Sequence, residues 1–163
     1  MTQHNRTIIR SLALDDEAVL WEMLYQALYV PQGNAELPRE IVQLPEIARY
    51  VQNWGREGDG GFLASEARTG QAIGAVWLRL LTGKHKSYGY VDDDIPELSM
   101  AVLPDYRGQG VGTQLLTHLL LSDYGQRPMS LSVSANNPAM RLYERFGFEI
   151  VSMHDESLTM RRD

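Results

Sequence analysis

Arg107-Gly108-Gln109-Gly110-Val111-Gly112 decides the fold of this chain, because of the elements predicted on either side of it. Residues 97–103 before it form a short apolar segment typical of a strand, which Pro104 ends. After it, apolar residues recur at the spacing of one helix face: Val111, Leu115, Leu116, Leu119 and Leu120. A glycine-rich turn between a strand and a helix N-terminus presents unpartnered N–H groups to an anion. The sequence therefore predicts a site for a phosphate or pyrophosphate group.

The turn does not match the two most familiar phosphate-binding motifs. A nucleoside-triphosphate P-loop needs a lysine at the helix start, and Gly110-Val111-Gly112-Thr113 has none. A dinucleotide-binding fingerprint needs a third glycine at the position of Thr113. Both classes of ligand site are therefore excluded.

A second motif follows about twenty-five residues later, over residues 134–148. Asn137 suits a helix N-cap and Pro138 suits the first helical position. One apolar helix face follows, made of Ala139, Leu142, Tyr143 and Phe146. Gly147 is a natural left-handed C-cap, after which residues 148–151 resume as a strand. The segment predicts a capped helix followed by a strand.

Together the two motifs resemble those of the GNAT superfamily of N-acetyltransferases. Its acetyl-CoA signature is Gln/Arg-x-x-Gly-x-Gly/Ala, which Arg107, Gly110 and Gly112 match. Its second motif is Asn-x-x-Ala-x-x-Leu-Tyr followed by an aromatic-Gly-Phe stop. The matching residues are Asn136, Ala139, Leu142, Tyr143, Gly147 and Phe148. The resemblance covers nearly the whole chain.

Composition is that expected of a globular protein. The chain has 163 residues, of which 44% are hydrophobic and 22% charged, and it can bury a substantial core in a single domain over residues 1–163. It has no cysteine, so a thiolate nucleophile and disulfides are excluded. A net charge of −6 without a Lys/Arg stripe argues against nucleic-acid binding. With no membrane-length apolar run and a polar start, we expect a cytoplasmic protein that binds neither membrane nor nucleic acid. The four histidines show no H-x-x-x-H pairing, so no metal is expected.

The remaining patterns predict an alternation of strands and helices. Strands are expected over residues 7–10, 62–67, 72–81, 97–103, 129–134, 148–151 and 157–160, the last as an edge strand. Helices are expected over residues 15–29, 111–120 and 138–146, with another after Pro45. The helix over residues 15–29 would bury Leu20, Met23, Leu24, Ala27 and Leu28. The helix after Pro45 would bury Ile47, Tyr50, Val51 and Trp54. Residues 83–94 are expected to form a polar insertion. This order is that of the GNAT fold, an α/β domain with a mixed, mostly antiparallel twisted sheet of six to seven strands and about four helices.

The resemblance implies acetyl-CoA as co-substrate. Its pyrophosphate would lie on backbone N–H groups of residues 107–113, and its pantetheine arm would pair with residues 100–103 like an added strand. The expected cofactor-binding residues are Met100, Ala101, Val102, Arg107, Gly108, Gln109, Gly110, Val111, Gly112, Thr113, Asn136 and Tyr143. Asn136 would bond to the arm or only shape the turn, and from the residues alone the glycines could form merely a tight turn.

The resemblance also implies two catalytic residues. Tyr143 would be the general acid that protonates the leaving CoA thiolate, and its alternative role is that of a core tyrosine. Glu97 would be the general base for the attacking amine, directly or through a water, and its alternative is a solvated strand-end carboxylate. A β-bulge is expected in the strand that Glu97 begins.

The acceptor is not fixed by the sequence. Acidic and aromatic residues of the insertion and of the first helix form one expected rim, which would attract a cationic amine. They are Tyr88, Tyr90, Asp92, Asp93 and Asp94 in the insertion, and Glu22, Tyr25, Gln26 and Tyr29 in the helix. A small amine and a protein amine both remain open, as does a merely solvated loop.

The expected activity is direct transfer of an acetyl group to a primary amine in a ternary complex. Two alternatives stay open: a non-catalytic acyl-CoA sensor, and a GNAT enzyme with another acyl donor or an O-linked acceptor. A homodimer through an exposed edge strand after Val151 is a further expectation.

Overall fold

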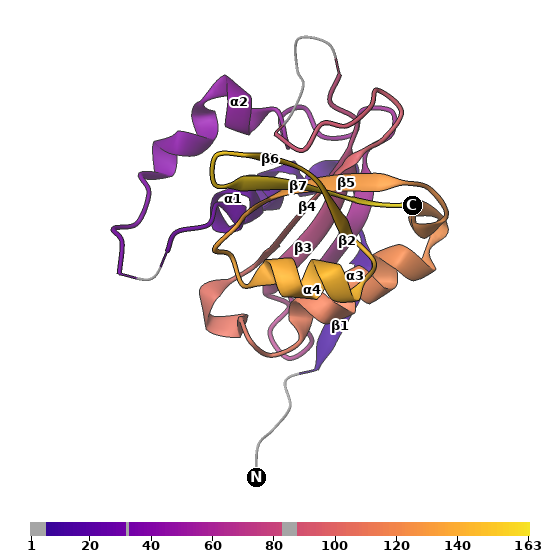
Figure 1. Cartoon of the computed structure of the whole chain (residues 1–163). Coiled ribbons are helices and arrows are strands. Elements are labelled where there is room, and N and C mark those ends of the chain that lie inside the picture. Colours follow the sequence, from indigo (N-terminus) through magenta and orange to yellow (C-terminus); the bar gives the residue numbers. More distant parts are fainter. Residues whose placement is uncertain (1–5, 32, 83–87) are drawn as a thin grey trace.

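The computed structural model describes residues 6–31, 33–82 and 88–163, and a seven-stranded sheet runs through it (Figure 1). The strand order is β1-β2-β3-β4-β5-β7-β6. The strands are β1 (Thr7–Ser11), β2 (Gly60–Glu66), β3 (Ala72–Arg79), β4 (Glu97–Val102), β5 (Met129–Ser134), β6 (Glu149–His154) and β7 (Ser157–Arg162). All neighbouring pairs are antiparallel except β4 and β5, which are parallel. The sheet is therefore mixed and mostly antiparallel, as predicted.

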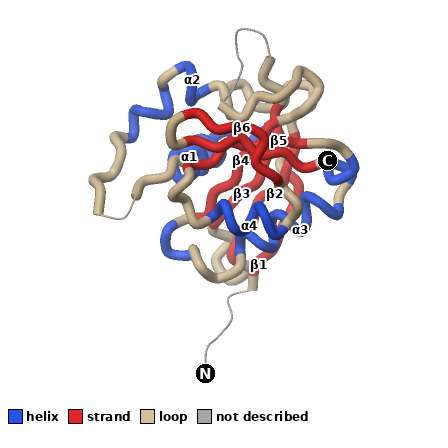
Figure 2. Tube along the Cα trace, in the orientation of Figure 1, coloured by secondary structure: helices blue, strands red, loops and turns tan. Residues whose placement is uncertain are grey.

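Helices cover both faces of this sheet (Figure 2). The α-helices are α1 (Glu17–Ala27), α2 (Pro45–Ala48), α3 (Val111–Leu121) and α4 (Ala139–Arg145), and 3-10 turns lie at Leu14–Asp16, Arg39–Gln43, Pro104–Tyr106 and Asp123–Gln126. The element order agrees with the prediction, apart from these turns.

The core is divided by the sheet, because side chains alternate between its faces. On one face, α3 buries Leu115, Leu116 and Leu119 completely against Val76 and Leu78 of β3. On the opposite face, α1 packs Leu20, Met23 and Leu24 against Ala75 and Trp77. The predicted inward faces of both helices are thus confirmed, although Ala27 and Leu28 are only half-buried.

The sheet splits between β4 and β5. Within the described residues these two strands share one register pair, Glu97 with Ser130, whereas β3–β4 and β5–β7 each pair over six residues. Beyond that point the facing backbone edges of Ser99–Val102 and Ser132–Ser134 lack a partner strand. The split leaves room for an extended ligand between two strands of one sheet.

Two predictions about strands need correction. The last strand, β7, is not at the edge, because it lies between β5 and β6, and the edge strands are β1 and β6. The bulge expected in β4 is not found against β3, because the register runs uninterrupted from Gly74 with Val102 to Arg79 with Glu97. Register shifts occur in β2 and β6 instead.

The second helix is also shorter than expected. It ends at Ala48, although Tyr50, Val51 and Trp54 are buried as predicted. After its end, the carbonyl oxygens of Arg49 and Gln52 accept hydrogen bonds of 3.0 Å and 2.6 Å from Nη1 of the buried Arg79 guanidinium. The backbone then takes a positive φ of 59° at Asn53, which does not continue a helix. The predicted insertion lies partly outside the described residues, at 83–87, and residues 88–94 are a loop.

Among the residues that the model describes, no helix is long and apolar enough to cross a membrane.

Candidate active site

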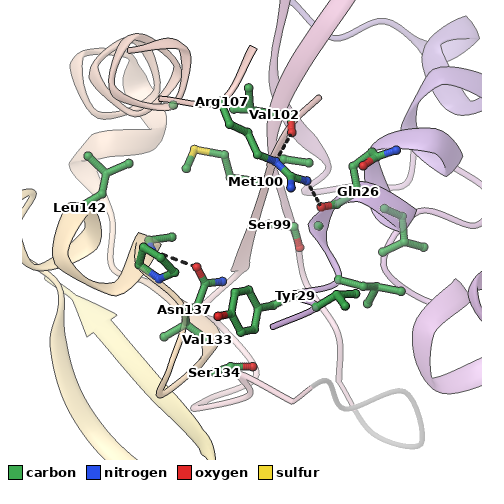
Figure 3. A pocket seen from close by; sticks show the side chains of 18 of the residues that line it. Gln26, Tyr29, Ser99, Met100, Val102, Arg107, Val133, Ser134, Asn137 and Leu142 are labelled. Atoms are coloured by element: carbon green, nitrogen blue, oxygen red, sulfur yellow. Dashed lines mark hydrogen bonds between the residues drawn. The ribbon is translucent and has the colours of Figure 1, made fainter. Parts of the chain in front are cut away.

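The diverging segments of β4 and β5 line a cavity of about 940 Å³. Its other walls come from the end of α1, the glycine turn, the start of α3 and helix α4. Figure 3 shows how Arg107, Met100, Leu142, Asn137 and Tyr29 surround it. The cavity therefore lies where the sheet splits and where the first turn of α3 begins.

The glycine turn exposes backbone to this cavity. Gly108 and Gly110 have φ angles of +75° and +86°, which L side chains rarely adopt, and a Cβ at either would meet nothing within 4 Å. Gly110 is the N-cap of α3, so the N–H groups of the next residues lack acceptors within the helix. The positive end of the α3 dipole and the exposed backbone of the glycine turn together suit the binding of an anionic group.

Arg107 lines the cavity and bridges two of its walls (Figure 3). Its Nε donates to the carbonyl oxygen of Val102 at 2.9 Å, and its Nη2 donates to that of Gln26 at 3.2 Å. The guanidinium thus joins the end of β4 to the end of α1.

Tyr143 belongs to the core and also lines the cavity. It is 7% exposed, and its ring packs edge-on against Phe148, with 5.8 Å between ring centroids. Burial raises the pKa of its hydroxyl, so the group is protonated at neutral pH and can donate a proton. Both roles considered for this tyrosine are compatible with its position.

Glu97 lines the same cavity at the point where β4 and β5 meet. It is 5% exposed, so the alternative of a solvated strand-end carboxylate is wrong. Its Oε1 accepts a hydrogen bond of 2.8 Å from the backbone N–H of Gly89. A carboxylate held in this way can accept a proton without first being drawn out of solvent.

Most of the predicted site residues line this one cavity. They are Glu97, Met100, Ala101, Val102, Arg107, Gly108, Gly110, Val111, Gly112, Thr113 and Tyr143. Gln109 and Asn136 are exposed residues outside its lining, and Gln109 donates instead to the carbonyl oxygen of Asp105 (3.0 Å). Asn137, not Asn136, lines the cavity, and its Oδ1 accepts from the Ala139 N–H at 2.9 Å, as a cap does.

The expected acceptor rim is only partly assembled. Four of its members line the cavity: Tyr25, Gln26, Tyr29 and Tyr88. The others lie outside the lining, and Tyr90 is bonded to Asp93 at 2.6 Å. The cavity is also lined by residues that the motifs did not single out, notably Tyr50, Glu36 and the hydroxyl-bearing Ser99, Ser132 and Ser134. The alternation of serines along β5 was a usable signal, because every second residue faces one side.

Tyr29 also closes one side of the cavity. Its hydroxyl donates to the carbonyl oxygen of Asn136 at 3.1 Å, across 107 residues of sequence. In Figure 3 its side chain reaches from the α1 side toward the turn between β5 and α4. Only tertiary structure brings these residues together.

Solved acetyltransferases share this fold. The ribosomal-protein-S18-alanine N-acetyltransferase of Escherichia coli is 21% identical, with 96% of this chain and 93% of that chain covered and a TM-score of 0.61. PaiA N-acetyltransferase of Thermoplasma acidophilum, solved in complex with coenzyme A, is 18% identical, with 97% and 99% covered and a TM-score of 0.60. At these identities the likeness shows the fold alone.

Sequence relatives match over shorter segments. Mycothiol acetyltransferase of Cellulomonas flavigena is 36% identical over 94 residues, which are 54% of this chain and 26% of that protein. The chain spans less than a third of the length of the curated relatives it matches.

The family model described as "Acetyltransferase (GNAT) family" matches residues 21–148, which include the glycine turn, β4, β5 and α4. This match covers most of the chain and both motifs of the cavity. The chain therefore belongs to the GNAT family of acetyltransferases.

Proposed function

We propose that this protein is an acetyl-CoA-dependent N-acetyltransferase that moves an acetyl group directly to a primary amine in a ternary complex. The observation that carries the proposal is that Glu97, Tyr143 and the glycine turn all line one cavity. Acyl transfer from a phosphate-bearing thioester needs a general acid, a general base and a site that binds the phosphate groups. Tyr143, Glu97 and the glycine turn can supply these three functions.

The cavity fits the shape of such a co-substrate. Backbone N–H groups at the start of α3 suit the pyrophosphate, and the edge of residues 99–102 that pairs with no described strand suits the amides of a pantetheine arm. A Cβ at Gly112 would stand 3.3 Å from Met100 Cε and 3.4 Å from Leu142 Cδ2, so a side chain here would crowd two other residues that line the cavity. The match between an extended anionic ligand and the split in the sheet supports acetyl-CoA.

The bound co-substrate supplies the acetyl thioester. Glu97 accepts a proton from the acceptor amine, whose nitrogen forms the new bond to the acetyl carbon as the carbon–sulfur bond breaks. Tyr143 gives its hydroxyl proton to the departing thiolate, and burial keeps that proton in place until then. The acylated nitrogen then loses its second proton, which restores the hydroxyl of Tyr143. Charge and protons thus balance without a covalent enzyme intermediate.

The acceptor that we propose is a small-molecule amine or a protein amine. The described residues that line the cavity together with Glu97 offer the rings of Tyr29, Tyr50 and Tyr88 and the carboxylate of Glu36. Aromatic faces and carboxylates attract a protonated amine before it is deprotonated.

Replacement of Tyr143 by phenylalanine tests the proposal. The ring contact with Phe148 is retained, so the affinity for acetyl-CoA and the melting temperature should change little, whereas kcat should fall roughly 100-fold. Thiol release with a panel of amines measures turnover, and calorimetric titration with acetyl-CoA measures affinity. Tyr124→Phe is the matched control, because Tyr124 is partly exposed and lies outside the cavity.

The outcomes separate the proposal from its alternatives. Tight acetyl-CoA binding by the wild-type protein with no thiol release on any small or peptide amine would favour an acyl-CoA sensor. Thiol release with succinyl-CoA in preference to acetyl-CoA would point to another donor. Full activity of the Tyr143→Phe variant would remove Tyr143 from the mechanism.

A further inference from the structure

We infer that Gly89 is a positioning residue whose backbone fixes the carboxylate of Glu97. The inference rests on the proposed function, in which Glu97 is the general base, and it adds a residue that carries no chemically reactive side chain.

The backbone of Tyr88 and Gly89 is held by side chains. The Gly89 N–H donates to Oε1 of Glu97 at 2.8 Å, and the Gly89 carbonyl accepts from Oγ of Ser130 at 2.7 Å. One residue earlier, the Tyr88 N–H donates to the hydroxyl of Tyr50 at 3.0 Å. A loop residue bonded at both ends to buried side chains has little freedom to move.

The two partners of Gly89 mark the point where the sheet splits. Glu97 and Ser130 are the register pair that joins β4 to β5, and both are buried. Gly89 therefore links β4 to β5 through its hydrogen bonds with the side chains of Glu97 and Ser130. These hydrogen bonds set where the carboxylate of Glu97 lies relative to the cavity that begins at this pair.

Glycine is required at this position by space, not by a left-handed backbone. A Cβ on residue 89 would stand 2.8 Å from the carboxyl carbon and Oε1 of Glu97, and 2.8 Å from the backbone carbon of Leu131. Since Leu131 is part of a strand, residue 89 would have to shift away from it, and the carboxylate of Glu97, which is bonded to the Gly89 N–H, would be displaced as well. Alanine would thus move the carboxylate itself while leaving its chemistry unchanged.

A displaced base loses rate because the proton must be taken at a defined distance, and a misplacement of about 1 Å can cost about 100-fold. We expect Gly89→Ala to lower kcat about 10- to 100-fold, with an unchanged Kd for acetyl-CoA. Ser130→Ala, which removes only the hydroxyl that holds the Gly89 carbonyl, should lower kcat by a smaller factor in the same direction.

A double-mutant cycle with Glu97→Gln tests the inference. If Gly89 acts through Glu97, then Gly89→Ala should cost little further kcat once residue 97 is glutamine. Gly70→Ala is the control glycine substitution, because Gly70 lies in the β2–β3 turn outside the cavity and an added Cβ would meet nothing within 4 Å. Its φ of +75° should lower the thermal midpoint of this control without lowering kcat. The thermal midpoint and the stoichiometry of acetyl-CoA binding establish that each variant is folded. If Gly89→Ala does not fold, the same double-mutant cycle is measured with Ser130→Ala in its place.

An equal fold-loss from Gly89→Ala in both backgrounds would overturn the inference, as would wild-type kcat in Gly89→Ala alongside an impaired Glu97→Gln. Failure of the proposed function looks different. In that case the wild-type protein transfers no acetyl group, or Glu97→Gln retains full turnover.

Discussion

The Nε of Arg107 donates to the carbonyl oxygen of Val102 at 2.9 Å, which ties the start of the glycine turn to the last residue of β4. The same guanidinium reaches the carbonyl oxygen of Gln26 near the end of α1. Carbonyls at a helix C-terminus lack partners and carry the negative end of its dipole, so a cation is stabilised there. One side chain thus holds together three walls of the cavity.

Arg107→Ala should weaken acetyl-CoA binding with little effect on kcat. The loss of an exposed, charged hydrogen-bonding group from the cavity lining is expected to cost about 1.4 kcal/mol, which is roughly a tenfold rise in Kd. Titration calorimetry measures this, and Arg127→Ala, at an exposed arginine outside the cavity, is the control. An unchanged Kd would show that the backbone alone binds the co-substrate.

Asp59→Ala should destabilise the protein by about 3–5 kcal/mol, because it leaves the buried guanidinium of Arg79 without its counter-charge. The two side chains form a buried ion pair with Nη2 and Oδ2 2.8 Å apart. Urea unfolding measures the change in free energy. The exposed Asp123→Ala should change it by less than about 0.5 kcal/mol, and an equally small effect at Asp59 would refute the argument.

The pair of Arg10 and Asp16 should make stability depend on acid pH. The hydrogen bond from Arg10 lowers the pKa of Asp16, helped by the Ala13 N–H at 2.6 Å. A carboxyl with a lowered folded-state pKa contributes stability above its unfolded pKa, and that contribution is lost as pH falls through the folded pKa. Because Arg10 is half exposed, the contribution at neutral pH is about 1 kcal/mol.

Asp16→Asn tests this pH dependence. Urea unfolding should show the variant less stable than wild type at pH 7, and the difference should vanish in strong acid. Asp94→Asn, at an exposed aspartate, is the matched control. A difference that persists unchanged into acid would mean that Asp16 acts by packing and not by charge.

We propose that β6 mediates a homodimer. It is the edge strand, and its apolar residues Ile150, Val151 and Met153 are 47%, 52% and 66% exposed. An unpaired edge with exposed apolar side chains favours pairing with another strand. Light scattering during gel filtration should give the mass of a dimer for the wild type and of a monomer for Val151→Lys. Leu121→Lys, at an exposed leucine on α3, should stay dimeric, and a wild-type monomer would contradict the proposal.

The elements with local signals could be predicted from the sequence. Helix α4 follows from the Asn137 cap and from Gly147, whose φ of +94° is the predicted left-handed stop. The glycine turn and α3 follow equally from local pattern. These features depend on a few neighbouring residues, so the chain specifies them without reference to the rest of the fold.

The features that depend on distant partners could not be predicted. The place of β7 between β5 and β6 is a choice among strand orders, all of which satisfy the same alternation of side chains. The hydrogen bonds that the Arg49 and Gln52 carbonyls accept after the end of α2 come from Arg79, about thirty residues further along the chain. Gly89 gave no signal as a site residue, because its role lies in its backbone and in space that only the fold defines.

The single register pair between β4 and β5 within the described residues has a mechanical consequence. The sheet is built as two hydrogen-bonded ladders, β1 to β4 and β5 to β6, that meet at one rung. A change in the angle between them breaks few backbone hydrogen bonds, so the stiffness of the joint comes from side chains such as Leu98 and Leu131, packed beneath it against α3. Substitutions that change the volume of that core should therefore tune the angle between the ladders while each ladder stays intact.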